Sequence, residues 1–552
     1  MVNAWSRFLL PSVSDLIFVL LVIALSTGTL GPKLLGDAGI GWHIRTGELI
    51  LTTHSVPRVD LFSSTMNGKP WYAWEWLYDA LVGAIHRTAG LNGVAFFSAV
   101  LIALTFALVF RMMLARGASL GIAVVMLLLA VSASSIHFLT RPHILSWLFT
   151  VIWFAALDGF ETGGKSRRLV WLPVIMGVWV NWHGGFLVGF VLQGIYLIAA
   201  CARKLNGSPD GSDALSRTRA LLMTGVLMLV ATFANPYGYK LHVHIYRYLS
   251  DRFLMDHIDE FLSPNFHGLP QKCFAVLLLL TIVGVAVGRT RLRTSQLLVT
   301  CFAVYTGLYA SRNIPVSSML LVLIMAPVLS TAAGEWVGNS AMVRRGLARW
   351  QDFGVRMKAT ESRLHGHAWA ILVVVLGAWI CFHQGRLGSR TLMNASFDGT
   401  RFPVQAVDFL ARNHVREPVF CPDSWGGYLI YRLYPRTRVV VDDRHDLYGA
   451  DFLKEYLKIM RGEDQWDRVL GKMHANWVLV PKASALANLL GEAPAWRNVY
   501  RDETAALFQR VSEGTDNEPM CVTTRLKPRL RIGRPSGTRS YFRLSHSAEA
   551  LA

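Results

Sequence analysis

Several acidic residues stand among tryptophans in a polar stretch at residues 31–92, and this combination could support acid–base chemistry. The members are Asp37, His43, Glu48, Asp60, Glu75 and Asp79, between Trp42, Trp71, Trp74 and Trp76. Carboxylates beside an apolar surface are costly to keep charged, so such residues are usually retained for chemistry. We expect Asp37 to act as a general base that deprotonates an acceptor hydroxyl. Glu75 and Glu48 remain alternative catalytic carboxylates.

Each of these carboxylates also has a structural explanation. Asp37 could cap a following helix, because Asp is a favoured N-cap residue. Glu75 and Asp79 are four residues apart and would share one helix face. That pair could form a second acid site or a solvated polar stripe, and we favour the stripe.

Two arginines, Arg141 and Arg312, each lie within three residues of a proline at the end of an apolar segment. The planar guanidinium matches phosphate and stays charged. We therefore expect the pair to bind a lipid-linked phosphate or diphosphate. The alternative is that both arginines only anchor helix ends at the membrane interface.

Other short polar motifs also follow apolar segments and add candidates for substrate binding. These candidates are His43, His183, Asn181 and Tyr237. A further polar loop after Tyr237 contains His242, His244, Asp256, His257, Asp259 and Glu260. We expect no cofactor and no metal, because no HExxH or equivalent spacing is present. A divalent metal held by His183 and His143 with Asp37 or Glu75 is the alternative.

The composition indicates what must position these residues. The chain has 552 residues, of which 53% are hydrophobic and only 16% charged, whereas soluble proteins carry about 25% charged residues. The net charge of +19 does not indicate nucleic-acid binding, because most basic residues lie in short loops between apolar segments and in the C-terminal tail. The six cysteines show no CxxC spacing, so neither a disulfide framework nor a zinc site is indicated.

We predict about eleven transmembrane spans, since a crossing helix needs about 20 apolar residues. The expected ranges are 14–31, 93–114, 118–136, 143–160, 169–182, 184–201, 219–234, 272–288, 294–310, 314–333 and 368–384. The segments 169–182 and 184–201 are separated only by His183, so either they form a tight hairpin or one of them is re-entrant.

The basic loops set the orientation through the positive-inside rule. With the N-terminus inside, the predicted inside loops carry Arg111 and Arg116; Lys165, Arg167 and Arg168; Arg203, Lys204, Arg217 and Arg219; Arg289, Arg291 and Arg293; and Arg344, Arg345, Arg349, Arg356 and Lys358. The first loop (residues 31–92) and residues 385–552 then lie outside, with every polar motif named above. Within the first loop, 38–52 and 74–88 should be amphipathic helices on the membrane, with Ile40, Trp42, Ile44 and Leu51 able to face lipid.

Residues 398–511 are predicted to form a soluble α/β domain. The expected strands are 415–421, 437–442 and 476–481, with 498–500 and 505–508 as a closing hairpin. Gly426 and Gly427 open a helical connection. The run Asp442-Asp443-Arg444-His445-Asp446 at a strand end could bind a metal or sugar, or it could cap the next helix and pair with its own arginine, which we favour. Residues 512–552 form a basic tail with a composition typical of disorder.

The layout resembles the GT-C superfamily of polytopic glycosyltransferases, in the branch of protein mannosyltransferases and aminoarabinose transferases. The resemblance is one of layout: an inside N-terminus, Asp37 soon after the first span, and two interfacial helical stretches, 38–52 and 74–88, in the same loop. The pattern Gly41-Trp42-His43, Gly47-Glu48, Pro57-Arg58, Asp60, Phe62-Ser63, Trp71 and Glu75-Trp76-Leu77 also resembles that of a bacterial membrane-protein group described as glycosyltransferase-like. It covers residues 1–335, followed by a basic cytoplasmic loop and last span at 336–397. One departure is that Ala38 follows Asp37, where many members carry a paired Asp-Glu.

The resemblance implies a fold, a reaction and partners. The fold is a mainly α-helical membrane bundle with a C-terminal α/β domain. The reaction is transfer of a hexose or pentose, with inversion, from a polyprenyl phosphate or diphosphate to an extracytoplasmic glycan, lipid or protein. Asp37 would be the base, and Arg312 or Arg141 would stabilise the leaving phosphate. The chain would then reside in a bacterial inner membrane. The alternatives are a transporter or flippase of lipid-linked glycans and a non-enzymatic envelope assembly factor.

Overall fold

The computed structural model describes residues 9–28, 30–163, 166–205, 211–288, 291–335 and 367–511, with isolated positions between 353 and 364. These residues form two compact units. Unit 1 comprises residues up to Leu34, Trp74–Val243 and Glu260–Ala395, and unit 2 comprises Leu35–Ala73, His244–Asp259 and the chain from Ser396 onward. The first loop is therefore shared between the two units. The predicted basic tail, 512–552, lies outside the described residues, as does most of the predicted inside loop at 336–352.

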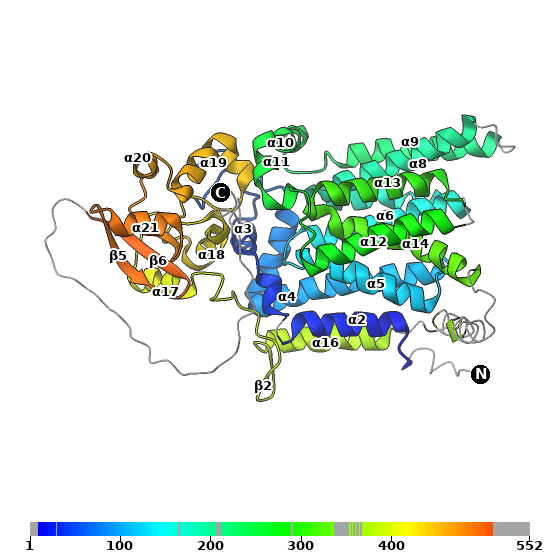
Figure 1. Ribbon diagram of the computed structural model, residues 1–552, viewed down its shortest axis with the longest axis horizontal. Coiled ribbons are helices and arrows are strands. Elements are labelled where there is room, and N and C mark those ends of the chain that lie inside the picture. Colours follow the sequence, from blue (N-terminus) through cyan, green and yellow to red (C-terminus); the bar gives the residue numbers. More distant parts are fainter. Residues whose placement is uncertain are drawn as a thin grey trace. The chain divides into compact units, whose positions relative to one another are not determined.

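Unit 1 is a bundle of helices whose long members run side by side (Figure 1). They are α2 (Val13–Ser26), α4 (Trp76–Ala115), α5 (Leu120–Ser134), α6 (His143–Gly163), α7 (Trp171–Trp179), α8 (Leu187–Leu205), α9 (Gly211–Ala231), α12 (Leu269–Val287), α13 (Thr294–Tyr309), α14 (Ile314–Glu335) and α16 (Ala368–Phe382). A short hairpin, β1 (Arg386–Leu387) and β2 (Arg390–Thr391), follows α16. The helix α10 (Tyr239–Ser250) begins in this unit.

Each predicted span coincides with an apolar helix, but their lengths differ. Among the described residues, six helices are long and apolar enough to cross a membrane: Trp76–Ala115, Leu120–His137, His143–Gly163, Gly184–Arg203, Leu269–Val287 and Ser311–Ala333. The helix α7 has nine residues, a length of about 14 Å against a hydrocarbon core of about 30 Å. The prediction of a mainly helical, polytopic membrane chain is confirmed, and the count of eleven spans stays a prediction.

The helix α4 combines a predicted interfacial helix with a predicted span. It runs over 40 residues and is interrupted at Gly90, whose backbone has φ 60° and ψ −159°. That left-handed φ suits glycine, which lacks a Cβ. The break lies between the predicted segments 74–88 and 93–114. The sequence therefore predicted both halves of α4 and their separation.

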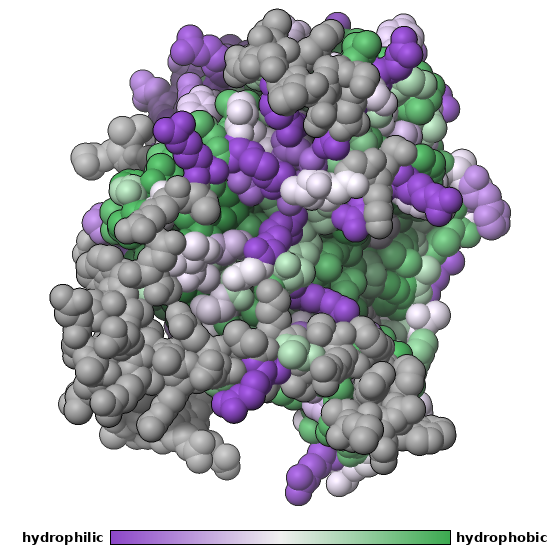
Figure 2. All heavy atoms as spheres, turned by 90° about the vertical axis from the view of Figure 1, so that its right-hand side faces the viewer, coloured by the Kyte–Doolittle hydropathy of each residue, from purple (hydrophilic) through white to green (hydrophobic). Residues whose placement is uncertain are grey.

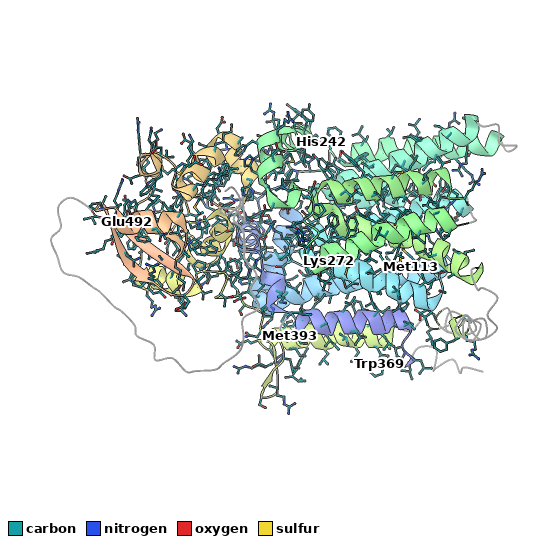
Figure 3. All side chains as sticks on the ribbon, viewed as in Figure 1. Met113, His242, Lys272, Trp369, Met393 and Glu492 are labelled. Atoms are coloured by element: carbon teal, nitrogen blue, oxygen red, sulfur yellow. The ribbon has the colours of Figure 1, made fainter. Side chains whose placement is uncertain are left out.

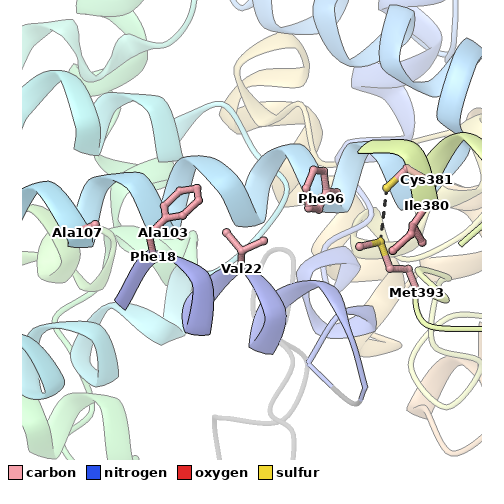
Figure 4. Packing of buried hydrophobic residues seen from close by; sticks show 8 residues of the cluster. All are labelled: Phe18, Val22, Phe96, Ala103, Ala107, Ile380, Cys381 and Met393. Carbon is pink, nitrogen blue, oxygen red and sulfur yellow. Dashed lines mark hydrogen bonds between the residues drawn. The ribbon is translucent and has the colours of Figure 1, made fainter. Parts of the chain in front are cut away.

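The first and last described apolar helices of unit 1 pack together on α4 (Figure 4). Phe18 and Val22 of α2 and Ile380 of α16 belong to one buried cluster with Phe96 of α4. A Cβ on Gly377 would come within 2.3 Å of the Phe96 ring, so only glycine allows this approach of α16 to α4. The outward faces of α2 and α16 remain apolar and exposed, as expected of helices in lipid.

Unit 2 is an α/β domain built on a four-stranded sheet in the order β3-β4-β6-β5. The strands are β3 (Val419–Phe420), β4 (Trp477–Pro481), β5 (Trp496–Arg501) and β6 (Ala505–Arg510). The strands β3 and β4 are parallel, and the other neighbours are antiparallel. The helices are α3 (Ile40–Thr53), α11 (Arg252–His257), α17 (Val404–Arg412), α18 (Asp423–Leu433), α19 (His445–Arg461), α20 (Trp466–Lys472) and α21 (Ala485–Glu492). The predicted α/β character and closing hairpin are confirmed.

The first loop extends this sheet. The predicted strand 437–442 forms only isolated bridges, in which Val439 pairs in parallel with Val419 on one side and with Ser63 on the other. The Val439 N–H donates to the Phe62 carbonyl at 3.3 Å, and the Ser64 N–H donates to the Val439 carbonyl at 2.8 Å. Residues 62–64 thus protect what would be an exposed sheet edge.

The helix α3 packs against α18 rather than against lipid. Ile40 and Ile44 are fully buried, and Trp42 is nearly so. A Cβ on Gly41 would lie 2.1 Å from the Gly427 carbonyl oxygen, so glycine is required for this close approach. The predicted helix 38–52 is confirmed, but the prediction that Ile40, Trp42 and Ile44 face lipid was wrong. The twin glycines 426 and 427 serve close packing.

Candidate functional site

Six ionisable residues from four segments of unit 1 form an electrostatic cluster, which we call the histidine–arginine cluster. Its members are His137, Arg141, His143, His183, Glu260 and Arg312. His137 and Arg141 follow α5, and His143 is the first residue of α6. His183 lies between α7 and α8, Glu260 precedes α12, and Arg312 follows α13. Figure 3 shows His242 on α10 and Lys272 at the start of α12 at one end of unit 1. The sequence placed all these motifs outside, and the structure brings the members of the cluster together.

The central contact is an ion pair between Arg312 and Glu260. The Arg312 Nη1 atom lies 3.2 Å from Glu260 Oε1, and the two side chains are 29% and 33% exposed. The central carbon of the Arg312 guanidinium also lies 4.5 Å from the centre of the Phe261 ring. The two short 3-10 helices that carry these residues, η5 (Asp259–Phe261) and η6 (Ser311–Asn313), are joined because the Ser311 N–H and hydroxyl both donate to the Leu262 carbonyl, at 2.8 and 2.9 Å.

Positive charge dominates the surroundings of Glu260. Burial alone would raise the pKa of Glu260, but the charges of Arg312 and Arg141 lower that pKa to about 2. The carboxylate is therefore ionised at any physiological pH. Arg141 and Arg312 thus act on one anionic group, as a phosphate clamp requires.

The orientation of His183 is set by a chain of hydrogen bonds. The Gly185 N–H donates to His183 Nδ1 at 2.9 Å, and the Ser146 hydroxyl lies 2.9 Å from the same nitrogen. The Trp179 indole N–H donates to Ser146 Oγ at 2.8 Å, which leaves the hydroxyl proton for His183. Because Nδ1 accepts, neutral His183 carries its proton on Nε2. Burial, and then the charge of Arg312, hold the pKa of His183 well below its usual value.

The Nε2 atom of His183 faces Glu75. It lies 3.8 Å from Glu75 Oε1, and the Glu75 side chain is 12% exposed. This distance is longer than a hydrogen bond. Asp79, one turn further along α4, is fully buried. The interpretation of Glu75 and Asp79 as a solvated stripe was therefore wrong, because both side chains are largely removed from solvent.

The chain before Asp37 is anchored beside Arg141. The Thr140 N–H and hydroxyl both donate to the Leu34 carbonyl, at 2.9 and 3.0 Å. Thr140 is nearly completely buried. The start of the first loop is therefore attached to the segment that carries the first candidate arginine.

The other three first-loop candidates belong to unit 2. Asp37 is partly buried, and its Oδ1 accepts the Gly39 N–H at 2.7 Å, which forms a turn just before α3. Glu48 pairs with Arg45 at 2.7 Å, and the Arg45 Nε–H donates to the Tyr431 carbonyl at 2.9 Å. His43 is buried, and its ring lies 3.6 Å from that of Trp42. Glu48 therefore has a structural partner on its own helix.

Asn181 joins three segments of unit 1. Its amide group donates to the carbonyls of Gly177 and Ala234 at 2.8 and 2.7 Å, and its Oδ1 accepts the Trp76 indole N–H at 2.7 Å. These contacts account for Asn181 without a ligand. Tyr237 lies in the turn after α9, where its N–H donates to Asn235 Oδ1 at 2.8 Å.

The arrangement of histidines does not fit a metal site. His143 Nε2 lies 2.9 Å from the His137 carbonyl and so donates its proton there, and His183 Nδ1 accepts two hydrogen bonds. In the part of the chain that the structure describes, no group of three His, Cys, Asp or Glu residues could hold a metal ion. The metal alternative therefore gains no support from the geometry.

The Asp442–Asp446 run forms a buried network of ion pairs and hydrogen bonds in unit 2. Arg444 lies 2.8 Å from Asp60 Oδ1 and 2.7 Å from Asp442 Oδ2, and all three side chains are at most 1% exposed. The Trp42 indole N–H donates to Asp443 at 2.9 Å. The remaining pairs are His445 with Asp423, at 2.8 Å, and Asp446 with His244, at 2.9 Å. The arginine-pairing interpretation agrees with these contacts.

A second charged network lies at the other end of α6. Asp158 and Glu161 are about 23 and 27 Å along the helix from His143. Asp158 pairs with Arg116 at 3.0 Å, and Glu161 pairs with Arg203 at 2.8 Å and Arg293 at 2.7 Å. These arginines come from three predicted inside loops, so those loops share one end of unit 1. Figure 2, which faces this end, shows hydrophilic residues gathered around an apolar surface.

Comparison with known proteins shows the fold. No family model and no curated protein matches the sequence. The structure is similar to the oligosaccharyltransferase AglB from Archaeoglobus fulgidus, in complex with an inhibitory peptide and a dolichol-phosphate, with a TM-score of 0.53 and 11% identity over 92% of this chain and 74% of that chain. The same enzyme tethered to an acceptor peptide gives a TM-score of 0.50 and 12% identity over 85% of this chain and 68% of that chain.

A third similar structure is that of ArnT from Cupriavidus metallidurans bound to undecaprenyl phosphate. It has 16% identity and a TM-score of 0.46, and the match covers 90% of this chain and 97% of that chain. The two comparisons with AglB show that the chain has the fold of that oligosaccharyltransferase. The predicted resemblance in fold is confirmed.

Proposed function

We propose that the protein is a membrane glycosyltransferase that moves a sugar from a polyprenyl phosphate or diphosphate to an acceptor outside the cytoplasm. The observation that carries this proposal is that Arg312 lies 3.2 Å from Glu260 and that the charge of Arg141 acts on the same carboxylate. Two guanidinium groups acting on one anion suit the phosphate of a lipid-linked donor. The AglB fold, which is found with a dolichol-phosphate, supports the same substrate class.

The reaction would invert the anomeric carbon. A carboxylate accepts the proton of the acceptor hydroxyl, the acceptor oxygen forms the new bond to that carbon, and the bond to the phosphate oxygen breaks. The leaving phosphate then carries the negative charge that Arg312 and Arg141 stabilise. The sugar is a hexose or a pentose, and the acceptor is a glycan, a lipid or a protein.

Asp37 and Glu75 are the two candidates for the base. Asp37 is supported by its position in the sequence and by its attachment to an anchored segment, because three residues of chain span at most about 11 Å from Leu34. Glu75 is supported by its position 3.8 Å from His183. The Nε2 atom of His183, which carries the imidazole proton, faces that carboxylate. Glu48 is the least supported of the three, because it pairs with Arg45.

The protein would reside in a bacterial inner membrane with its N-terminus inside and residues 385–552 outside. The arginines that surround Asp158 and Glu161 support this orientation, since inside loops are rich in arginine. A cysteine introduced at position 256, in α11, should be labelled by a membrane-impermeant maleimide from outside. Labelling only from the cytoplasmic side would contradict the orientation.

The test of the function is a transfer assay. The purified full-length chain is reconstituted in lipid vesicles with undecaprenyl-phosphate-linked pentoses and hexoses and an envelope extract as acceptor, and release of undecaprenyl phosphate is measured. Asp37→Asn and Glu75→Gln are compared at equal folded concentration, and the variant of the true base should lose about 10²–10⁴-fold in rate. Absence of release from every donor by the folded wild-type chain would reject the proposal.

A further inference from the structure

The ion pair between Glu260 and Arg312 is more exposed to solvent than the structural ion pairs of Arg444. Buried structural pairs in this protein are closed on all sides, as at Arg444, whereas Glu260 and Arg312 each keep about a third of their surface accessible, 33% and 29%. Partly exposed ion pairs contribute little to stability. The pair therefore costs little to open, and its two partners remain accessible to a competing ion.

The carboxylate of Glu260 stands where an anionic ligand of the two arginines would be held. It carries a negative charge on a planar oxygen pair, and both Arg312 and Arg141 act on it. Phosphate makes the same kind of charge-assisted contact with a guanidinium fork. Only one of the two anions can take the donors of Arg312 that face Glu260.

We infer that Glu260 is an internal substitute for the donor phosphate, which occupies Arg312 in the empty enzyme and must be displaced when the lipid-linked donor binds. This inference rests on the proposed function, because it assumes that Arg312 binds the donor phosphate. Displacement breaks one ion pair and forms another, so the number of paired charges on Arg312 is conserved.

Two features of the structure suit such an exchange. The backbone of the segment is held independently of the ion pair, because Ser311 donates twice to the Leu262 carbonyl. The Phe261 ring contacts the Arg312 guanidinium, so the arginine keeps one neighbour when the carboxylate leaves. Arg312 would therefore stay in place while its anionic partner changes.

The exchange lowers the apparent affinity for the donor. A ligand that must displace an internal partner binds only to the open fraction of the protein, and its apparent Kd rises by the inverse of that fraction. For a partly exposed ion pair of ordinary strength this factor is about fivefold. The consequence is weaker retention of the polyprenyl phosphate product, which favours its release after transfer.

The experiment measures binding of undecaprenyl phosphate to the full-length chain in nanodiscs of neutral lipid. Glu260→Gln removes the charge and keeps the side-chain shape, so we expect the Kd to fall about fivefold. Glu260→Asp retracts the carboxylate by one methylene and should give a smaller decrease. Asp256→Asn, at an exposed acid of α11 four residues before Glu260, is the matched control and should leave the Kd unchanged.

The outcomes separate the inference from the function on which it rests. Tighter binding by Glu260→Gln, together with loss of binding by Arg312→Gln, supports both. An unchanged or higher Kd for Glu260→Gln, with binding still lost in Arg312→Gln, overturns the inference and leaves the phosphate clamp in place; Glu260 would then only position Arg312. Unchanged binding by Arg312→Gln overturns both. If Glu260→Gln does not fold, the comparison of Glu260→Asp with the wild-type chain decides in the same way.

Discussion

Unit 1 and unit 2 each contain a cluster of arginine, histidine and acidic residues, and the two clusters differ in charge balance and exposure. In unit 2, Arg444 is enclosed by two carboxylates, Asp60 and Asp442, and none of the three is more than 1% exposed. In unit 1, Arg312 pairs with Glu260, the charge of Arg141 acts on the same carboxylate, and all three residues remain partly accessible. Accessibility distinguishes this candidate anion site from the enclosed network of the same residue types.

The largest expected effect comes from removing the cation of the buried cluster in unit 2. Arg444→Met leaves Asp60 and Asp442 buried without their cation, which should lower the free energy of unfolding by about 3–5 kcal/mol. Denaturant unfolding of the full-length chain, followed by tryptophan fluorescence, measures the change. Replacing all three residues, with Asp60→Asn and Asp442→Asn added, should recover most of the loss. A single variant within about 1 kcal/mol of the wild-type chain would contradict the structural role.

The accessible cluster should respond in activity rather than in stability. Arg312→Gln removes a donor to the leaving phosphate and should lower the transfer rate about 10²–10³-fold. The free energy of unfolding should change by less than about 1 kcal/mol, since the pair is partly exposed. The transfer assay and the unfolding measurement are made on the same preparation. A large loss of stability with an unchanged rate would reverse the comparison between the two clusters.

A third prediction concerns the space around His183. A Cβ on Gly185 would lie 2.7 Å from Ser146 Oγ and 2.8 Å from His183 Nδ1. Gly185→Ala should therefore displace the imidazole and destabilise the chain by about 1–3 kcal/mol. Gly184→Ala, where a Cβ would meet no atom within 4 Å, is the neighbouring control. Equal unfolding free energies for the two variants would show that the packing at Gly185 is looser than described.

The pH dependence of the unfolding free energy tests the ionisation of Glu260. Its pKa in the folded protein, about 2, lies below the ordinary value of 4.5, so its contribution to stability is present above about pH 4.5 and is lost as the pH falls towards 2. The difference in unfolding free energy between the wild-type chain and Glu260→Gln should therefore shrink between pH 5 and pH 3. A difference that grows on acidification would mean that Glu260 is protonated in the folded protein.

The smallest effect is expected for an ordinary surface pair. Arg432 lies 2.7 Å from Asp408, and the side chains are 36% and 38% exposed. Arg432→Gln should change the unfolding free energy by at most about 1 kcal/mol and leave the transfer rate unchanged. It is the shared control for the variants at Arg444 and Arg312. A change in the transfer rate would show that the assay responds to charge alone.

The sequence predicted the helices well because their signals are local. The apolar segments, the break near Gly90 and the closing hairpin each follow from patterns within a few residues. The sequence also named Arg141, Arg312 and His183, which the structure brings together, because polar residues at the ends of apolar helices stand out. It did not identify Ser146, which orients His183, since a serine inside an apolar helix carries no distinguishing pattern.

What the sequence could not predict are contacts between distant segments. The amphipathic pattern of 38–52 is the same whether its apolar face meets lipid or protein, so the partner of α3 could not be read from it. Glu260 was visible as one acid among several in a loop, and only the fold shows that Arg312 is the residue it pairs with. The tight contact of Gly41 with Gly427 likewise depends on two glycines that carry no pairing signal.

That contact has a consequence for how the chain is made. Gly41 leaves the ribosome long before Gly427, and at about 5–20 residues per second the delay is about 20–80 s. During that time the segment around α3 has no helix α18 to pack on, and its buried tryptophan and isoleucines are exposed. A membrane surface or a chaperone would have to shelter this segment. Truncated chains that end before residue 427 should therefore be preferred substrates for proteolysis within the first loop.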